Sequence, residues 1–425
     1  MTEERPTRET SIDLVRGADV LLMLFVNEMA GVRGTPAFLL HKSRDADGMT
    51  ITDVVFPAFL FIVGLAIPFA LGRRPDGAPR RGLWRHVLVR AFALLVMGVL
   101  MVNAEYAGAG GLLSPDAWNA LMTAALILVW MAPARGALER ARPVLRAAGL
   151  VALAALVFLY RSREGVGLVQ LQPHWWGILG LIGWAYLVAA SLYLLAGDRP
   201  AVHLGAAALL YCLCLADQAG QVAWLASLPP SFRVGRIMAP HAAIAVSGVL
   251  FGVMLVRHRR DGGPPSRLVG PVLGAAAGLA AAGWLLNALH GLDPAFRISK
   301  ILATAPWCLL SSAITAAVWI AIFVMTNVTA VGSSLPLRGE GQGGGSMNKR
   351  PKAVSIAGEN ALMCYLLPPL LLSLFALSAP LFGGTNFYEK LGGSLGIGLV
   401  RSVAFAWIVV RLGGLLRGAG IRLQL

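Results

Sequence analysis

The sequence predicts an all-α, polytopic integral membrane protein. Of its 425 residues, 57% are hydrophobic and only 13% are charged, whereas soluble domains are typically about half apolar and about a quarter charged. The mean hydropathy is +0.70. Apolar runs of about 20 residues recur along the whole chain, and such a run crosses a bilayer as a helix. These features exclude a soluble enzyme, a disulfide-stapled secreted domain and a disordered scaffold.

Apolar runs separated by polar breaks predict about twelve membrane-spanning helices, within a range of ten to twelve. Helices are expected because lipid offers no hydrogen-bonding partner to the backbone. The fourth, fifth and seventh runs are the shortest. In chain order, the runs cover residues 12–31, 51–71, 84–103, 117–132, 146–160, 177–196, 201–216, 238–256, 268–289, 303–327, 357–379 and 393–414.

The formal net charge of +15 follows the predicted membrane topology. Most Lys and Arg residues fall in alternate loops, and loops rich in these residues face the cytoplasm. This bias predicts that both termini are cytoplasmic and that the loop after the first span lies outside. It also explains the positive charge without nucleic acid as a partner, because basic loops face anionic lipid.

Composition divides the chain into three predicted parts. Residues 332–353 are rich in Gly and Ser within a basic frame, which is typical of a flexible cytoplasmic linker. The main bundle is therefore predicted over residues 1–331, the linker over 332–353, and a C-terminal transmembrane pair over 354–425. The first ten residues are polar, so no cleaved signal peptide is expected. The four cysteines lie in apolar runs and are expected to be buried free thiols without a metal.

The first predicted span carries a stripe of polar residues. Ionisable residues inside a membrane are costly and are functional candidates. At 100° per residue, Asp13, Arg16 and Asn27 fall on one face, and Asp13 lies about 21 Å from Asn27 along the helix axis. The alternative is structural: Asp13 and Arg16 neutralise each other, and Asp19 bonds to a neighbouring helix.

The loop after this span contains His41, and the next span begins with Thr52 and Asp53. A histidine titrates near neutrality and can act as a base or a nucleophile. An amide such as that of Asn27 can donate a hydrogen bond to a developing oxyanion. The alternatives are a solvated loop histidine, and a helix N-cap formed by Thr52 and Asp53.

Later spans add polar candidates for binding substrate or for structure. Lys300 and Trp307 lie at the start of the tenth span, and Glu359 and Asn360 lie at the start of the eleventh. The last two residues can instead satisfy the free backbone donors of a helix N-terminus.

Four arginines, Arg73, Arg74, Arg80 and Arg81, lie in the second predicted cytoplasmic segment. Guanidinium groups bind phosphates well, so these residues are candidates for binding a phosphorylated co-substrate. The positive-inside rule explains them equally well without any ligand.

Several segments together resemble the transmembrane acetyltransferases related to heparan-α-glucosaminide N-acetyltransferase. The most specific lie in the first 65 residues, and Arg44 departs from the pattern, because the family commonly has tryptophan there. The gap from His41 to Asp53 is also longer than is usual in the family. The segments are Ser11–Gly17, Phe25–Asn27, His41, Asp53–Gly64, Trp176–Trp184, Ala305–Leu309 and Ala357–Leu362.

The resemblance implies a function. Family members take an acetyl group from cytosolic acetyl-CoA and deliver it across the membrane to the amine of a terminal glucosamine. A loop histidine is catalytic and His41 matches it; an asparagine supports that histidine and Asn27 matches it. For this chain the resemblance implies acetyl-CoA as co-substrate, no metal, an amino-sugar or glycan acceptor, and a bacterial inner-membrane location. The resemblance leaves open whether the acceptor group is an amine or a hydroxyl, how long the acyl chain is, and whether the protein forms a homodimer.

Two other functions compete with an acyltransferase. A multi-span transporter or flippase for a sugar or lipid-linked glycan would also have many spans and buried charges. No internal repeat is visible, which disfavours this alternative mildly. A structural subunit of a larger complex would leave the polar stripe of the first span unexplained.

Overall fold

The computed structural model describes residues 9–72, 80–132, 137–163, 165, 167–228, 232–332 and 352–423. Across these ranges the chain is helical and forms no β-sheet. The longer helices are α1 (Thr10–Met29), α2 (Ile51–Leu71), α3 (Arg80–Glu105), α4 (Pro115–Trp130), α5 (Ala137–Leu159), α6 (Ile178–Ala196), α7 (Pro200–Gln218), α8 (Ala239–Asp261), α9 (Ser266–Asn287), α10 (Ala305–Gly332), α11 (Lys352–Glu359), α12 (Ala361–Leu377) and α14 (Leu395–Gly418). Short helices are η1 (Ala37–Leu39), η2 (Ala223–Ser227), η3 (Val234–Met238), η4 (Pro294–Phe296), η5 (Ala379–Phe382) and α13 (Phe387–Lys390).

The predicted fold class, a polytopic α-helical membrane protein, is confirmed. In the described part of the chain, nine helices are long and apolar enough to cross a membrane, and ten if one bent pair counts as a span. Each of the twelve predicted runs coincides with a helix or with that bent pair. Helix α1 carries four ionisable side chains and α4 has only 16 residues. These two helices are therefore too charged or too short to be counted among the nine. The count of twelve and the cytoplasmic termini stay predictions.

The eleventh predicted run is not one straight helix, which corrects the expectation for residues 357–379. Helices α11 and α12 meet at Asn360 with a bend of 94°. Before the bend, α11 crosses α1 at very close range. A Cβ at Gly17 would overlap the backbone carbonyl of Val354, and a Cβ at Gly358 would overlap that of Asp13. Glycine at both positions therefore permits the crossing.

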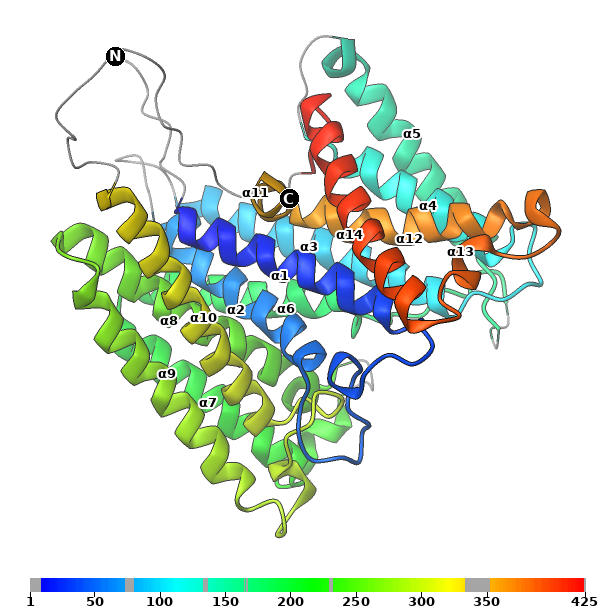
Figure 1. Cartoon of the computed structure of the whole chain (residues 1–425). Coiled ribbons are helices and arrows are strands. Elements are labelled where there is room, and N and C mark those ends of the chain that lie inside the picture. The colour runs from blue at the N-terminus through cyan, green and yellow to red at the C-terminus, as the bar shows by residue number, and fades with distance from the viewer. Residues whose placement is uncertain are drawn as a thin grey trace, which may run out of the picture.

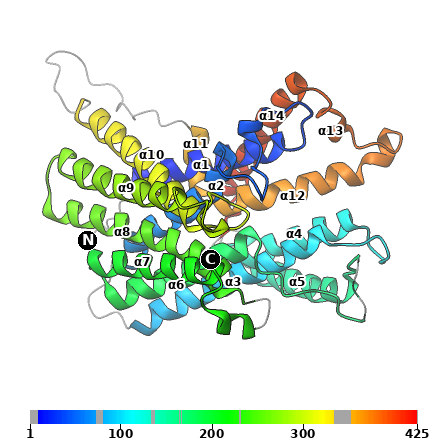
Figure 2. The ribbon, with the colours of Figure 1, turned by 90° about the horizontal axis from the view of Figure 1, so that it is seen from below.

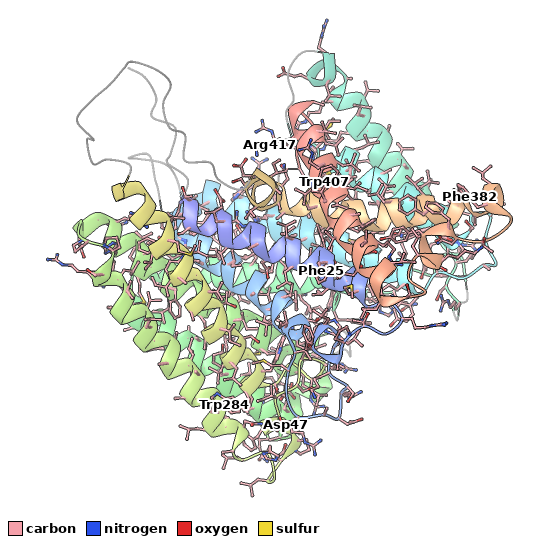
Figure 3. The ribbon with its side chains drawn as sticks, viewed as in Figure 1. Phe25, Asp47, Trp284, Phe382, Trp407 and Arg417 are labelled. Atoms are coloured by element: carbon pink, nitrogen blue, oxygen red, sulfur yellow. The ribbon has the colours of Figure 1, made fainter. Side chains whose placement is uncertain are left out.

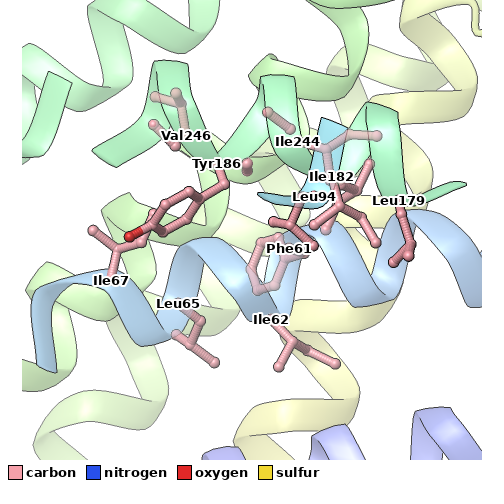
Figure 4. Close-up of a cluster of buried hydrophobic side chains, with 14 of the residues drawn as sticks. Phe61, Ile62, Leu65, Ile67, Leu94, Leu179, Ile182, Tyr186, Ile244 and Val246 are labelled. Carbon is pink, nitrogen blue, oxygen red and sulfur yellow. The ribbon is translucent and has the colours of Figure 1, made fainter. Parts of the chain in front are cut away.

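Helices α1, α2, α3 and α6 run through the centre of the molecule, with α7–α10 on one side and α4, α5, α12 and α14 on the other (Figures 1 and 2). The larger apolar core packs α2 and α6 against α8, with Phe61 of α2 on the side of Leu94 and Ile182 (Figure 4). A second core joins α1 to α11, α12, α13 and α14. Helix α1 therefore belongs to both cores.

Two smaller expectations are also tested by the fold. All four cysteines are free, but Cys212 is exposed on α7 rather than buried. Residues 333–351 of the predicted linker lie outside the described ranges. The division into a main bundle and a C-terminal pair stays a prediction, and α1 is the element that the two parts share.

Candidate active site

A cavity of about 630 Å³ runs along α1 and α2. Glu9, Asp13 and Arg16 line one end, and Asn27, His41 and Lys300 line the other. The middle is mostly apolar, with walls from α2, α3, α6 and α12. Because Asp13 and Asn27 are about 21 Å apart along the helix, the cavity follows most of the length of α1. The predicted polar stripe of α1 therefore faces a continuous internal space.

His41 lies in the loop between α1 and α2 and contacts Asp53 at the start of α2. Its Nδ1 is 2.8 Å from Asp53 Oδ1. An ionised carboxylate only accepts hydrogen bonds, so Nδ1–H donates and Nε2 keeps its lone pair in the neutral ring. The side chain of His41 is 43% exposed and that of Asp53 only 1%. The imidazole is thus held by a buried carboxylate while its other edge stays accessible.

The first turn of α2 fixes the Asp53 carboxylate. The backbone N–H of Thr50 donates to Asp53 Oδ2 at 3.0 Å, the Thr50 hydroxyl at 3.2 Å, and the Lys42 N–H at 3.2 Å. Thr50 is the N-cap of α2, which corrects the alternative that Thr52 and Asp53 form it. The Thr52 hydroxyl is instead buried without a hydrogen-bond partner among the described residues, and it lines the cavity.

Lys300 approaches the same imidazole from the segment between α9 and α10. Its Nζ lies 3.0 Å from Nε2 and 3.1 Å from Nδ1 of His41. An atom in the ring plane this close to both nitrogens would overlap the carbon between them, so the amine lies over the ring face. Burial lowers the pKa of Lys300, and the nearby charge of Asp53 opposes that shift. Lys300 therefore leaves the in-plane lone pair of Nε2 free.

Hydrogen bonds between the His41 loop and the segment before α10 hold Lys300 close to His41, and the sequence alone did not predict them. Asp47 Oδ1 accepts hydrogen bonds from the Ile298 N–H at 2.7 Å and from the Asn287 amide at 3.0 Å. The Gly48 N–H donates to the Ile298 carbonyl at 2.9 Å. Asp47 lies near the end of α9 that carries Trp284 (Figure 3). No sequence pattern relates positions 250 residues apart, so only the fold reveals this link.

Trp307 also converges on the site, as expected from its place near Lys300. The ring is fully buried on α10, and its N–H donates to the backbone carbonyl of Asp53 at 3.0 Å. The contact ties α10 to the first turn of α2. Asn27 lines the same cavity as His41, and its amide makes no hydrogen bond with the described residues.

The other predicted polar residues lie at the opposite end of the cavity. Arg16 donates to Asp13 at 3.0 Å and to the Gly358 carbonyl at 3.4 Å, so the predicted ion pair is present. Glu359 pairs with Arg417 of α14, and the Asn360 amide donates to the Gly413 carbonyl at 3.4 Å. These last two side chains have structural partners, although both residues also line the cavity.

Of the four arginines predicted to bind phosphate, the structure describes the side chain of only one, and another arginine lines the main cavity. Arg73 and Arg74 lie outside the described residues, as does the side chain of Arg80, and Arg81 is exposed at the start of α3 and lines neither of the two described cavities. Arg90, about two and a half helical turns further along α3, does line the main cavity. Its guanidinium carbon lies 4.7 Å from the centre of the Tyr186 ring. Its Nε is buried without a hydrogen-bond partner among the described residues. An arginine inside an apolar span is the signal that identifies it.

A second cavity of about 640 Å³ adjoins the first on the His41 side, and Phe56, Ile178 and Lys300 line both. His174 and Trp176 form one wall, with ring centres 4.2 Å apart. The remaining lining residues are Gln172, Pro173, Leu181, Arg233, Arg236, Ile237, His241, Ile301, Ala303 and Trp307. The two spaces therefore meet beside the His41 site.

Comparison with known proteins shows which sequences this chain is similar to. The family model described as "Domain of unknown function (DUF5009)" matches residues 8–224, just over half of the chain. Human heparan-alpha-glucosaminide N-acetyltransferase is 31% identical over 115 residues, which cover 27% of this chain and 16% of the human protein. The mouse protein of the same name is 31% identical over 109 residues, or 25% of this chain and 15% of the mouse protein. The chain thus belongs to the DUF5009 family and is related to the heparan-alpha-glucosaminide N-acetyltransferases.

Proposed function

We propose that this protein is a membrane N-acetyltransferase that transfers the acetyl group of cytosolic acetyl-CoA to the amine, or hydroxyl, of a sugar across a bacterial inner membrane. The observation that carries the proposal is the continuous cavity from Arg16 to His41. It gives a thioester from one end of α1 access to an imidazole at the other. The relationship to N-acetyltransferases supports this assignment.

His41 acts as the base or the acetyl carrier. Asp53 accepts from Nδ1–H at 2.8 Å, which fixes the ring orientation and leaves Nε2 to take the proton of the attacking amine or to bond the acyl carbon. As the thioester carbonyl becomes an oxyanion, the free amide of Asn27 donates to it. Losing one such oxyanion donor typically lowers the rate by about 10²–10³.

The nucleotide part of acetyl-CoA binds toward the other end of the cavity. Arg90 lines this space, and its buried Nε has no hydrogen-bond partner among the described residues; phosphate is the natural ligand for such a guanidinium. Arg16 is already paired with Asp13 and contributes less. Arg73, Arg74, Arg80 and Arg81 remain candidates for phosphate contacts at the cytoplasmic surface.

The sugar acceptor binds in the second cavity. Aromatic rings such as those of Trp176 and His174 offer apolar faces with a polar edge, which suits the faces of a sugar ring. A sugar placed there brings its amine to Lys300, and thereby to His41, because Lys300 lines both cavities. Donor and acceptor meet at the boundary between the two spaces.

The test uses purified protein in lipid nanodiscs with radiolabelled acetyl-CoA and a panel of amino sugars, with the products identified by mass spectrometry. Acetylated sugar is expected, and His41→Ala lowers the rate of the folded protein by about 10²–10⁴, together with a modest fall in the thermal unfolding midpoint, because Asp53 Oδ1 loses its donor. His290→Ala is the matched control, because this loop histidine lines neither cavity.

A parental rate in His41→Ala contradicts the proposed mechanism. If proteoliposomes instead accumulate the sugar without acetyl-CoA and no acetylated product forms, the protein is a transporter, and the cavity along α1 is its transport path.

A further inference from the structure

We propose that Lys300 is a self-acetylation site: when no sugar occupies the second cavity, the His41 site transfers the acetyl group of acetyl-CoA to Lys300 Nζ. This inference rests on the proposed acetyltransferase function. It assigns Lys300 as an internal acceptor whose modification shuts down an enzyme that has donor but no acceptor.

The position of the amine carries the inference. Lys300 Nζ lies 3.0 Å from His41 Nε2, at the boundary that both cavities share. It lies over the face of the imidazole rather than in its plane. An acyl group bonded to Nε2, or hydrogen-bonded near it, exposes its carbonyl carbon above and below that plane. The lysine amine therefore occupies the direction from which an acceptor amine attacks.

The surroundings of Lys300 favour a reactive amine. Among the described residues, no carboxylate forms an ion pair with it; Asp53 Oδ1 is engaged by His41, and Asp53 Oδ2 by Thr50 and Lys42. Burial also lowers the pKa of its ammonium group, against the opposing charge of Asp53. A larger fraction of this lysine is neutral, and only the neutral amine is a nucleophile.

The step balances without any further reactant. The neutral Lys300 amine attacks the thioester carbonyl carbon, a C–N bond forms, and the C–S bond breaks. The proton lost by the amine passes through His41 Nε2 to the leaving sulfur. The products are Nε-acetyl-lysine and CoA as the thiol. Because the amide nitrogen carries no charge and little basicity, acetylated Lys300 no longer presents an ammonium group to the acceptor cavity.

Lys42 offers a matched control within the same loop. It follows His41 directly in sequence, its side chain is exposed, and it lines neither cavity. Free acetyl-CoA reaches an exposed lysine more easily than a half-buried one, but the lowered pKa of Lys300 also makes its amine more reactive. A preference for Lys300 over Lys42 therefore measures transfer by the site only where His41→Ala removes that preference.

The experiment incubates the full chain in nanodiscs with acetyl-CoA alone, and quantifies acetylation of Lys300 and Lys42 by peptide mass spectrometry over time. We expect acetyl-Lys300 to accumulate ahead of acetyl-Lys42, His41→Ala to slow it by about 10²-fold or more, and an excess of a sugar acceptor to suppress it. After this preincubation, sugar acetylation should fall in proportion to the modified fraction, whereas Lys300→Arg should show no time-dependent loss from its own starting rate.

The outcomes separate the two proposals. Equal acetylation of both lysines, unaffected by His41→Ala or by acceptor, is chemical modification and overturns the inference. A preparation that acetylates a sugar but never Lys300 also overturns it and leaves the acetyltransferase function standing. If neither a sugar nor Lys300 is acetylated and no CoA is released, the proposed function fails and the inference fails with it.

Discussion

Two polar clusters lie at the same end of α1, and they differ in what can reach them. Glu28, Tyr388 and Arg401 form the first, which joins α1 to α13 and α14. All three residues are 8% exposed. The Tyr388 hydroxyl donates to the Glu28 carboxylate, Arg401 donates to the Glu28 carbonyl at 2.8 Å, and its guanidinium lies 4.7 Å from the Tyr388 ring centre. This cluster lines neither cavity.

The second cluster has similar components but a different exposure. Asp53 is a buried carboxylate and Lys300 a cation, but His41 between them is 43% exposed and faces the cavity. A cluster in which all partners are buried can only hold helices together. One whose central member is open to a cavity can exchange protons or acyl groups with a ligand. Accessibility, more than residue type, thus separates the clamp from the candidate site.

The largest expected effect comes from removing the charge of the carboxylate that holds His41. Asp53→Asn turns an acceptor into a group that can also donate, so Nδ1–H of His41 loses its fixed partner. We expect acetyl transfer to fall by about 10²–10⁴ with a small loss of stability from the weakened helix cap, about 1 kcal/mol. Initial rates and thermal unfolding of the same preparation measure both effects.

Glu28→Gln is the reciprocal variant. It leaves Arg401 buried without its charge partner, so the free energy of unfolding should fall by about 3–5 kcal/mol, while the turnover of the remaining folded protein stays near the parental value. If Glu28→Gln lowers turnover and Asp53→Asn does not, the assignment of clamp and site is reversed.

The sequence carried most of the fold but only part of the site. Apolar runs located every long helix, because a bilayer imposes their length and composition. The residues of the polar stripe and the loop histidine line one common cavity, and their roles there stay predictions. The approach of Lys300 to His41 and the link from Asp47 to Ile298 depend on how distant helices pack, which periodicity does not encode. The bend at Asn360 was not predicted, because Glu359 and Asn360 also fit the first turn of a single span, whereas they lie where two helices meet.

The arginine prediction shows a different limit. Runs of arginine at a span end satisfy the positive-inside rule whether or not they bind anything, so Arg73 and Arg74 carried little information about a ligand. A single arginine deep in an apolar helix has no such general cause. Arg90 was therefore the stronger signal, and its lining of the cavity gives it a specific test.

Arg90→Met should raise the KM for acetyl-CoA by about 10–100-fold, since a hydrogen bond to a charged group contributes about 1.5–3 kcal/mol. The kcat at saturating acetyl-CoA should change little, because Arg90 is remote from His41 along the cavity. Arg85→Met, at an exposed position of the same helix that lines neither described cavity, is the control. Equal effects of the two substitutions would assign both to general attraction of an anionic substrate.

The shared helix α1 can be perturbed without touching either cluster. Gly358→Ala introduces a Cβ that overlaps the backbone carbonyl of Asp13, so α11 must move away from α1. We expect a loss of about 1–3 kcal/mol in the free energy of unfolding. Gly278→Ala on α9 adds a Cβ with no atom within 4 Å and should be neutral or stabilising. Similar unfolding midpoints for the two variants would show that the close crossing contributes little.

The smallest effect concerns Lys300 alone. Burial lowers the pKa of Lys300 below its ordinary 10.5, and the nearby charge of Asp53 opposes that shift. Between the folded and unfolded pKa of Lys300, the unfolded state binds more protons, so stability rises with pH through that window. The difference in unfolding midpoint between the parental protein and Lys300→Met should therefore shift in favour of the parental protein as pH rises toward 10.5. A difference that stays constant over this range would mean that Lys300 titrates alike in the folded and unfolded states. That result contradicts a lowered pKa of the Lys300 ammonium group in the folded protein.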